Sequence, residues 1–579
     1  MIDRWIVDNP PSRRYPIYTR ANVGEVFPEP VAPLSATIGI TDNAEPGWRD
    51  AFERFGAFTR DEFDPDNNEI IGIFGGYCYL NVSVSRILGV RTPGLTPDVI
   101  DYTLFGEQPG VPPYTPQPTD EAPERTAKVG ETLQWILTTP DLPDLLEEKH
   151  TLDALRAERP DLSTLTNDEL VTRYRDLMNG HFRRLFGQHL FVTYAAMVPT
   201  GIIQQVCQEL GDPTLMLRLI AGVGDVDSAA PSWAMWDLGR AAAESATLTK
   251  LFDAGVDELH ARLEDNRADG DVAKFLGRFD DFLYEFGSRG PNEWELRSPT
   301  WETDPDLALA AIDRMRLTPA REAPAGHQQS RADDRGNLGP PLVEALAGNP
   351  EVQAQFQAAL NAATVFLAGR ERSKTNAIRL VHEGRMAMNE LGRRMVEAGH
   401  FDAPNNYGML RNEELDQLLA DPAAFTDEIR RREALYAELL ELEPPFVFEG
   451  DPPPLSEWPR RDARTVVSAG PGDVLTGIPG CPGQATGRAR VLADSHDPTA
   501  LEPGDVLVAP ITDPSWTPLF VPACAVVVDV GAPLSHAIIV SRELGIPCVV
   551  SVTDGTKRIP DGALVTVDGD AGTVTIQSD

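Results

Sequence analysis

The spacing of apolar residues changes twice along the chain, and each change predicts a different kind of structure. Up to about residue 125, short apolar runs such as 71–80 alternate with turn signals, and their secondary structure stays ambiguous. From about residue 128 apolar residues recur at helical spacing, and Thr166-Asn-Asp-Glu169 has the form of a capping box at the start of such a stretch. After about residue 476, short valine-rich runs suit buried strands. The pattern predicts a largely helical N-terminal part followed by a small mixed α/β domain.

The same periodicities give the expected elements by residue range. Further helices are expected around 234–264, 271–286, 305–315, 342–398 and 411–442. In the C-terminal part we expect strands at 505–509, 525–529 and 548–552, a helix at 535–544, and a closing hairpin formed by 563–568 and 573–576.

Two segments break these patterns and predict the domain organisation. A chain of 579 residues is too long for one compact core, so several domains are expected. Residues 318–341 contain almost no apolar side chains and several Pro and Gly, which predicts a mobile loop. Residues 443–475 are rich in proline, which predicts an extended linker. We therefore expect a mainly helical acceptor-substrate domain at 1–442, a Pro-rich linker at 443–475 and a C-terminal domain at 476–579.

Charge and composition exclude several classes of function. The formal net charge is −38 and no basic cluster stands out, so binding to nucleic acid or to an anionic membrane is not expected. The apolar stretches are shorter than a membrane span, and the first residues lack the order of a signal peptide, so a cytoplasmic protein is expected. The five cysteines show no CxxC pairing, so the sequence predicts neither a metal site nor a disulfide framework.

The clearest candidate for chemistry is His536, which lies after a predicted strand and in the first turn of a predicted helix. Ser535 is placed to be the N-cap of that helix. A phosphoryl group on the imidazole would lie near unpaired backbone N–H groups and the positive end of the helix dipole. Taken alone, a histidine at a helix start is more often structural. Two other histidines, His181 and His189, lie too far apart on one predicted helix to chelate a metal as neighbours, and they are assigned to packing.

Residues 476–579 resemble the mobile phosphohistidine domain of phosphoenolpyruvate synthase, pyruvate phosphate dikinase and rifampin phosphotransferase. The matching segments are PGQATGRARV at 482–491, PGDVLV at 503–508, PSWTP at 514–518, SHAIIVSRELGIP at 535–547 and VDGDAG at 567–572. The resemblance implies a swivelling β/β/α fold, with His536 as the residue that carries the phosphoryl group. One departure is Leu534, where the family usually has Thr.

The N-terminal part resembles, more weakly, the acceptor-substrate domain of rifampin phosphotransferase-like proteins. The similar segments are 19–34, 224–232, 287–295 and 370–374. The resemblance implies that Arg370 and Lys374, four residues apart and so on one helix face, bind the phosphoryl group together with Ser535. Alternatively, Arg370 and Lys374 are only charged side chains on a solvent-exposed face of the helix. Arg289 and Glu293 are weaker candidates for substrate binding, and a structural turn explains them equally well.

The resemblance also implies a reaction and a partner. Related enzymes load the histidine with an ATP-grasp domain, but this sequence shows no GxxxxGK phosphate loop and no glycine-rich, lysine-containing opening like theirs. The arrangement is similar to the catalytic subunit of phenylphosphate synthase, so we expect an ATP-grasp partner in trans that holds ATP and Mg²⁺. This chain is expected to bind no cofactor tightly.

The predicted function is transfer of a phosphoryl group from His536 to a hydroxyl of a small organic acceptor, such as a phenol or bulky alcohol. The alternative is a phosphocarrier or binding module without its own small-molecule acceptor.

Overall fold

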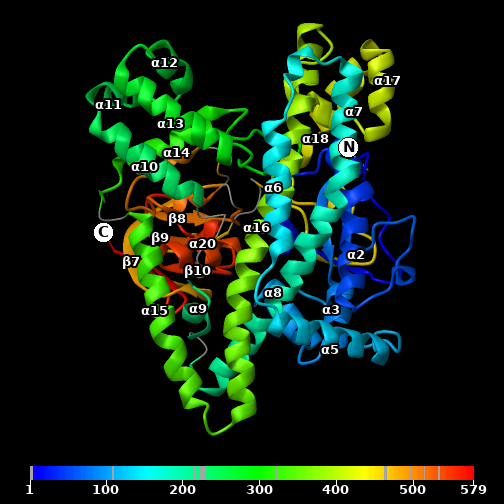
Figure 1. Cartoon of the computed structure of the whole chain (residues 1–579), viewed down its shortest axis with the longest axis vertical. Coiled ribbons are helices and arrows are strands. Elements are labelled where there is room, and N and C mark those ends of the chain that lie inside the picture. Colours follow the sequence, from blue (N-terminus) through cyan, green and yellow to red (C-terminus); the bar gives the residue numbers. More distant parts are fainter. Residues whose placement is uncertain are drawn as a thin grey trace.

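The computed structural model shows a large helical body joined to a smaller domain with a central sheet (Figure 1). The described residues are 4–106, 108, 110–212, 215–221, 230–320, 323–461, 466–493, 495, 497–513, 516–531 and 535–578. Leu534, and most of the segment 224–232 singled out above, lie outside these ranges.

A small antiparallel sheet forms one side of the N-terminal body. Its strands run in the order β2 (Ile71–Phe74), β3 (Tyr77–Asn81), β1 (Ile17–Thr19) and β4 (Val447–Glu449). The ambiguous apolar run at 71–80 is thus a hairpin, and its turn at Gly75 and Gly76 has positive φ at both residues, a conformation that glycine adopts without strain.

The first half of the predicted linker is part of the N-terminal body, so that prediction is wrong there. Strand β4 pairs with β1, and the Phe448 ring stacks on the Tyr18 ring at 5.5 Å between centroids. Trp458 is also buried. Apolar side chains among the prolines fix this stretch to the N-terminal body, because burying an aromatic ring offsets the entropy of ordering a short segment. Residues 462–465 of the linker lie outside the described ranges.

Two long helices form the centre of the N-terminal body. Helix α8 (Arg183–Glu209) packs along α16 (Pro350–Glu397), and α2 (Glu45–Phe55) and α7 (Asn167–Leu177) pack beside them. The predicted capping box starts α7: the Glu169 N–H donates to Thr166 Oγ1 at 3.2 Å and the Thr166 N–H donates to Glu169 at 2.7 Å. The continuous helical run Asn167–Glu209 is long and apolar enough to cross a bilayer, but 56% of its most apolar window is buried inside the protein, as in a core helix.

The predicted mobile loop at 318–341 is mostly helix, which corrects the sequence analysis. Helix α15 (Pro324–Ala345) forms a hairpin with α16 and also packs against α20 (His536–Leu544) of the C-terminal domain (Figure 1). The sequence of the N-terminal half of α15 is polar, but apolar residues in its C-terminal half, Leu338, Leu342 and Val343, pack against the main core. Tertiary packing therefore overrides a weak local signal.

A second helical unit joins the two parts of the chain. Helices α10 (Ala230–Glu244), α13 (Gly270–Phe286) and α14 (Pro305–Leu317) overlap the predicted helical ranges. Their buried residues form one apolar cluster with side chains of the C-terminal domain, among them Leu507, Phe520 and Ile538. The C-terminal domain is therefore docked on the helical body in this structure.

The C-terminal sheet contains the predicted strands, and its centre is parallel. The order is β5-β12-β11-β7-β8-β9-β10-β6, and β7 to β10 are mutually parallel. The bounds are β5 (Val474–Thr476), β6 (Ile478–Cys481), β7 (Gln484–Val491), β8 (Val506–Ala509), β9 (Ala525–Val528), β10 (Cys548–Val550), β11 (Leu564–Asp568) and β12 (Thr573–Ile576). The predicted strands, the helix α20 and the closing hairpin of β11 with β12 are confirmed. Helix α20 follows β9, so His536 lies at the carboxyl end of the parallel strands, where α/β sheets place their ligands.

Candidate active site

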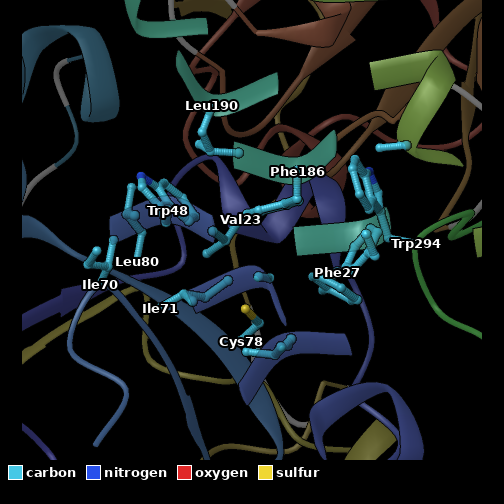
Figure 2. Packing of buried hydrophobic residues seen from close by; sticks show 14 of the residues in the cluster. Val23, Phe27, Trp48, Ile70, Ile71, Cys78, Leu80, Phe186, Leu190 and Trp294 are labelled. Atoms are coloured by element: carbon cyan, nitrogen blue, oxygen red, sulfur yellow. The ribbon is translucent and has the colours of Figure 1, made fainter. Parts of the chain in front are cut away.

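A cavity of about 220 Å³ lies where the C-terminal domain meets the helical body. Most of its wall is apolar and aromatic, and Figure 2 shows several of these side chains converging: Val23, Phe27, Trp48, Phe186, Leu190 and Trp294. A small number of charged and polar groups also face it, including Glu25, His189, Arg370, Lys374 and His536. An apolar cavity with a few convergent polar groups is the usual form of a small-molecule site.

His536 is held between two threonine hydroxyls in the first turn of α20. Its Nδ1 lies 3.1 Å from Thr512 Oγ1 and its Nε2 lies 3.2 Å from Thr517 Oγ1. Burial lowers the pKa of His536 well below its usual value, and the charges of Lys374, Arg289 and Arg370 lower it further. The imidazole is therefore neutral at physiological pH, and a neutral ring nitrogen is the form that can attack a phosphorus atom.

Ser535 occupies the predicted N-cap position, but it does not act as the predicted cap. Its backbone is extended, as an N-cap requires, yet its side chain makes no capping hydrogen bond. Ser535 Oγ is buried, borders the cavity, and has no hydrogen-bond partner among the described residues. A buried hydroxyl without a partner costs free energy, so it is suited to hydrogen-bond a group that enters the cavity.

Arg370 and Lys374 lie one turn apart on α16, and both face the cavity that His536 borders. Lys374 Nζ lies 3.2 Å from Glu293 Oε1. Among the described residues, no carboxylate lies within ion-pair distance of the Arg370 guanidinium. Its charge therefore remains available to an anionic group in the cavity.

Arg289 and Glu293 form a buried ion pair behind Lys374. Arg289 Nε donates to Glu293 Oε2 at 2.6 Å, and the two side chains are 5% and 2% exposed. Burial alone would raise the pKa of Glu293, but the charges of Arg289 and Lys374 outweigh it and hold that pKa below its usual range. The carboxylate thus fixes the position of Lys374. Glu293 borders the cavity, whereas Arg289 is not part of its wall.

Glu25 is a site residue that the sequence analysis did not single out, although it lies in the similar segment 19–34. It belongs to the short helix α1 (Val23–Val26), and its Oε2 accepts the backbone N–H of His536 at 3.4 Å. Burial raises the pKa of Glu25 to about 7, against smaller lowering effects from the His536 N–H, Arg370 and Lys374. The structure thus brings together a phosphoryl-carrier histidine candidate and a carboxyl group that titrates near neutral pH.

His189, assigned to packing from the sequence, also faces the cavity. Its Nδ1 lies 3.1 Å from Ser373 Oγ, and its ring lies 6.1 Å from the Trp294 ring. Burial and the nearby charges of Arg370 and Lys374 lower the pKa of His189 to about 3, so the ring stays neutral. Among the described residues, no group of three or more His, Cys, Asp or Glu side chains could hold a metal ion.

Two protein-family models match the chain, one on each side of this cavity. Residues 188–371 match the rifampicin phosphotransferase fourth domain, and residues 501–572 match the mobile domain of PEP-utilising enzymes. The predicted resemblance is confirmed by both matches. The first includes Arg289, Glu293 and Arg370 and ends three residues before Lys374, and the second includes His536.

Several curated proteins are similar to the chain. The rifampicin phosphotransferase of Streptomyces sviceus is 27% identical over 79% of this chain and 52% of its own length. The rifampicin phosphotransferase of Bacillus subtilis is 27% identical over 59% of this chain and 39% of its own length. The prodigiosin synthesizing transferase PigC of Serratia marcescens is 32% identical over 52% of this chain and 33% of its own length. The chain thus spans about a third to a half of the length of these relatives.

Proposed function

We propose that the protein is a phosphotransferase in which His536 receives a phosphoryl group and delivers it to a hydroxyl of a small organic acceptor in the cavity. The observation that carries this proposal is the position of His536: it borders the cavity together with Arg370 and Lys374, which lie on a helix of the other domain. A carrier residue, phosphoryl-binding cations and room for an acceptor therefore meet at one place. The family matches on both sides of the cavity support the same reaction class.

The proposed delivery step depends on charge and alignment. During transfer the phosphoryl group carries negative charge on its three equatorial oxygens, and the protein contributes mainly by positioning and electrostatic stabilisation. Arg370 has its charge free for these oxygens, Lys374 is held in place by Glu293, and Ser535 offers an unused hydroxyl at the start of α20. These are the proposed roles of the three residues.

The wall of the cavity favours an apolar acceptor. Aromatic and aliphatic side chains from several elements, including α1, α2, α8 and α16, make up most of the wall. The cations Arg370 and Lys374 are near enough to His536 for their charges to lower its pKa. A phenol or another bulky alcohol would bury its carbon skeleton against Trp48, Phe186 and Trp294, with its hydroxyl directed to His536.

Loading requires a different arrangement of the domains. In the docked state His536 is half-buried and borders the cavity between the two domains, so we infer that a nucleotide-binding protein cannot reach its imidazole there. We propose that the C-terminal domain leaves this position and that a separate ATP-grasp protein, holding ATP and Mg²⁺, phosphorylates His536. Calorimetry should then detect no micromolar binding of ATP to the purified chain, and such binding would contradict a donor in trans.

The experiment that tests the function is a chase with a loaded chain. Phosphoramidate, a small phosphoryl donor for histidines, loads the protein, the donor is removed, and phenol is added as acceptor. We expect phosphate to leave His536 and appear as phenyl phosphate. A loaded chain that passes phosphate to no phenol or alcohol, but does pass it to a protein, would support a phosphocarrier instead.

A further inference from the structure

Glu25 is a carboxylate in direct contact with the carrier histidine, yet binding of a phosphoryl group does not explain its position. Its Oε2 lies 3.4 Å from the His536 backbone nitrogen, and its side chain borders the same cavity as Arg370 and Lys374. A carboxylate repels a phosphoryl group, so its place beside the carrier needs another reason. Transfer to a hydroxyl provides one, since the attacking oxygen must lose a proton.

We propose that Glu25 is the general base that accepts the proton of the acceptor hydroxyl as this oxygen attacks the phosphoryl group on His536. The inference rests on the proposed function and assigns its proton-transfer step. Because α1 and α20 belong to different domains, the base meets the carrier only when the C-terminal domain is docked.

The step balances in atoms and electrons. The hydroxyl oxygen forms a bond to phosphorus while its proton moves to the Glu25 carboxylate. The phosphorus–nitrogen bond breaks, and its electron pair stays on the ring nitrogen of His536. The proton then returns from Glu25 to this nitrogen, directly or through water, so the products are a phosphate ester, neutral histidine and a Glu25 carboxylate.

The surroundings of Glu25 suit a base that works near neutral pH. The pKa of Glu25 is raised to about 7, mainly by burial and to a smaller extent by Asp513, while the His536 N–H, Arg370 and Lys374 act in the opposite direction. A base is most effective when its pKa lies near the working pH. His189, Glu293, Glu371 and Asp513 also line the cavity. The pKa of His189, about 3, makes it a far weaker base, and Glu293 is already paired with Arg289 and Lys374. Glu25 therefore combines contact with the carrier segment and suitable basicity.

The test is the delivery rate of Glu25→Gln after loading with phosphoramidate, with phenol as the acceptor. Glutamine keeps the shape and an oxygen to accept the His536 N–H but cannot take a proton. We expect normal loading and a delivery rate reduced by at least about 100-fold. In the parent, delivery should fall about tenfold for each pH unit below about 7, because Glu25 becomes protonated. In Glu25→Gln this dependence should disappear.

Two variants keep the test decisive. Glu25→Asp retains a carboxylate, so delivery should be slowed less than in Glu25→Gln and should keep its dependence on pH. The matched control is Glu29→Gln, four residues along the same segment, whose carboxylate contacts Tyr436 and Asn292 rather than His536. It should deliver like the parent.

The outcomes separate this inference from the proposed function. If Glu25→Gln delivers as fast as the parent with the same pH dependence, Glu25 is not the base, although transfer through His536 stands. A parent chain that loads but never phosphorylates an acceptor would overturn both. If Glu25→Gln is unstable to urea, Glu25→Asp decides: loss of the pH dependence there contradicts a base at this position.

Discussion

Lys374 Nζ lies 3.2 Å from Glu293 Oε1, and this contact links the face of the cavity to a buried ion pair behind it. Glu293 also accepts the Arg289 Nε–H at 2.6 Å, so one carboxylate that is 2% exposed holds two cations. The arrangement would position a flexible lysine at a low entropic cost in the proposed transfer, because its side chain is already ordered.

The first prediction concerns the stability of this pair. Glu293→Gln leaves the buried Arg289 and the half-buried Lys374 without this counter-charge, and removal of one partner from a buried ion pair is strongly destabilising. We expect the free energy of unfolding to fall by about 3 kcal/mol or more, measured by urea denaturation. The control is Glu397→Gln on the same helix α16, whose side chain is 65% exposed, and its effect should stay below about 1 kcal/mol. Equal effects of the two variants would contradict the structural role of Glu293.

The second prediction concerns the cations on α16. Lys374→Ala and Arg370→Ala should leave the loading of His536 unchanged, because loading takes place with the domain undocked. Each charged contact to the moving phosphoryl group is worth roughly 2 to 4 kcal/mol, so delivery should slow roughly 30- to 1000-fold. The measurement is the loss of labelled phosphate from the loaded chain after addition of phenol.

Another cation on the same helix, Arg379, provides the control for this experiment. Arg379 pairs with Asp153 at 2.6 Å and with Glu285, away from the cavity. Arg379→Ala should deliver at the parent rate. If Lys374→Ala and Arg370→Ala do so as well, the two residues form only a charged helix face and the phosphocarrier alternative gains support.

The third prediction is a pH dependence of stability that comes from Glu25. Its pKa rises from 4.5 to about 7 in the docked structure, so the folded chain binds a proton more tightly than the unfolded chain. This contribution to stability is complete below about pH 4.5 and is lost as the pH rises through about 7. Urea midpoints measured across this range should therefore fall more with rising pH in the parent than in Glu25→Gln. Parallel curves for the two proteins would show that Glu25 does not titrate with a raised pKa.

The sequence predicted the C-terminal domain well because its signals are local. Short stretches of sequence were enough to predict each element. The valine-rich runs predicted β8 and β9, the residues after Ser535 predicted α20, and the turn at 569–572 predicted the β11–β12 hairpin. The family resemblance then pointed to His536.

The rest of the site depends on contacts between residues that are far apart in the sequence. Glu25 meets His536 across 511 positions, and no local pattern predicts such a pairing. His189 borders the cavity because α8 packs against α16. The spacing between His181 and His189 in the sequence could not predict this packing. Helix α15 was expected as a loop because its stabilising contacts come from other elements, including α16 and α20.

The measurement that tests the central claim most directly is the location of phosphate on the chain after incubation with phosphoramidate, or with ATP, Mg²⁺ and a candidate ATP-grasp partner. Mass spectrometry of peptides from the loaded protein should find one phosphoryl group on His536, and this group should disappear when phenol is added. His536→Ala should remain folded, because the residue lies at a half-buried helix start, and should carry no transferable phosphate. Phosphate on another residue, or continued transfer by His536→Ala, would contradict the proposal.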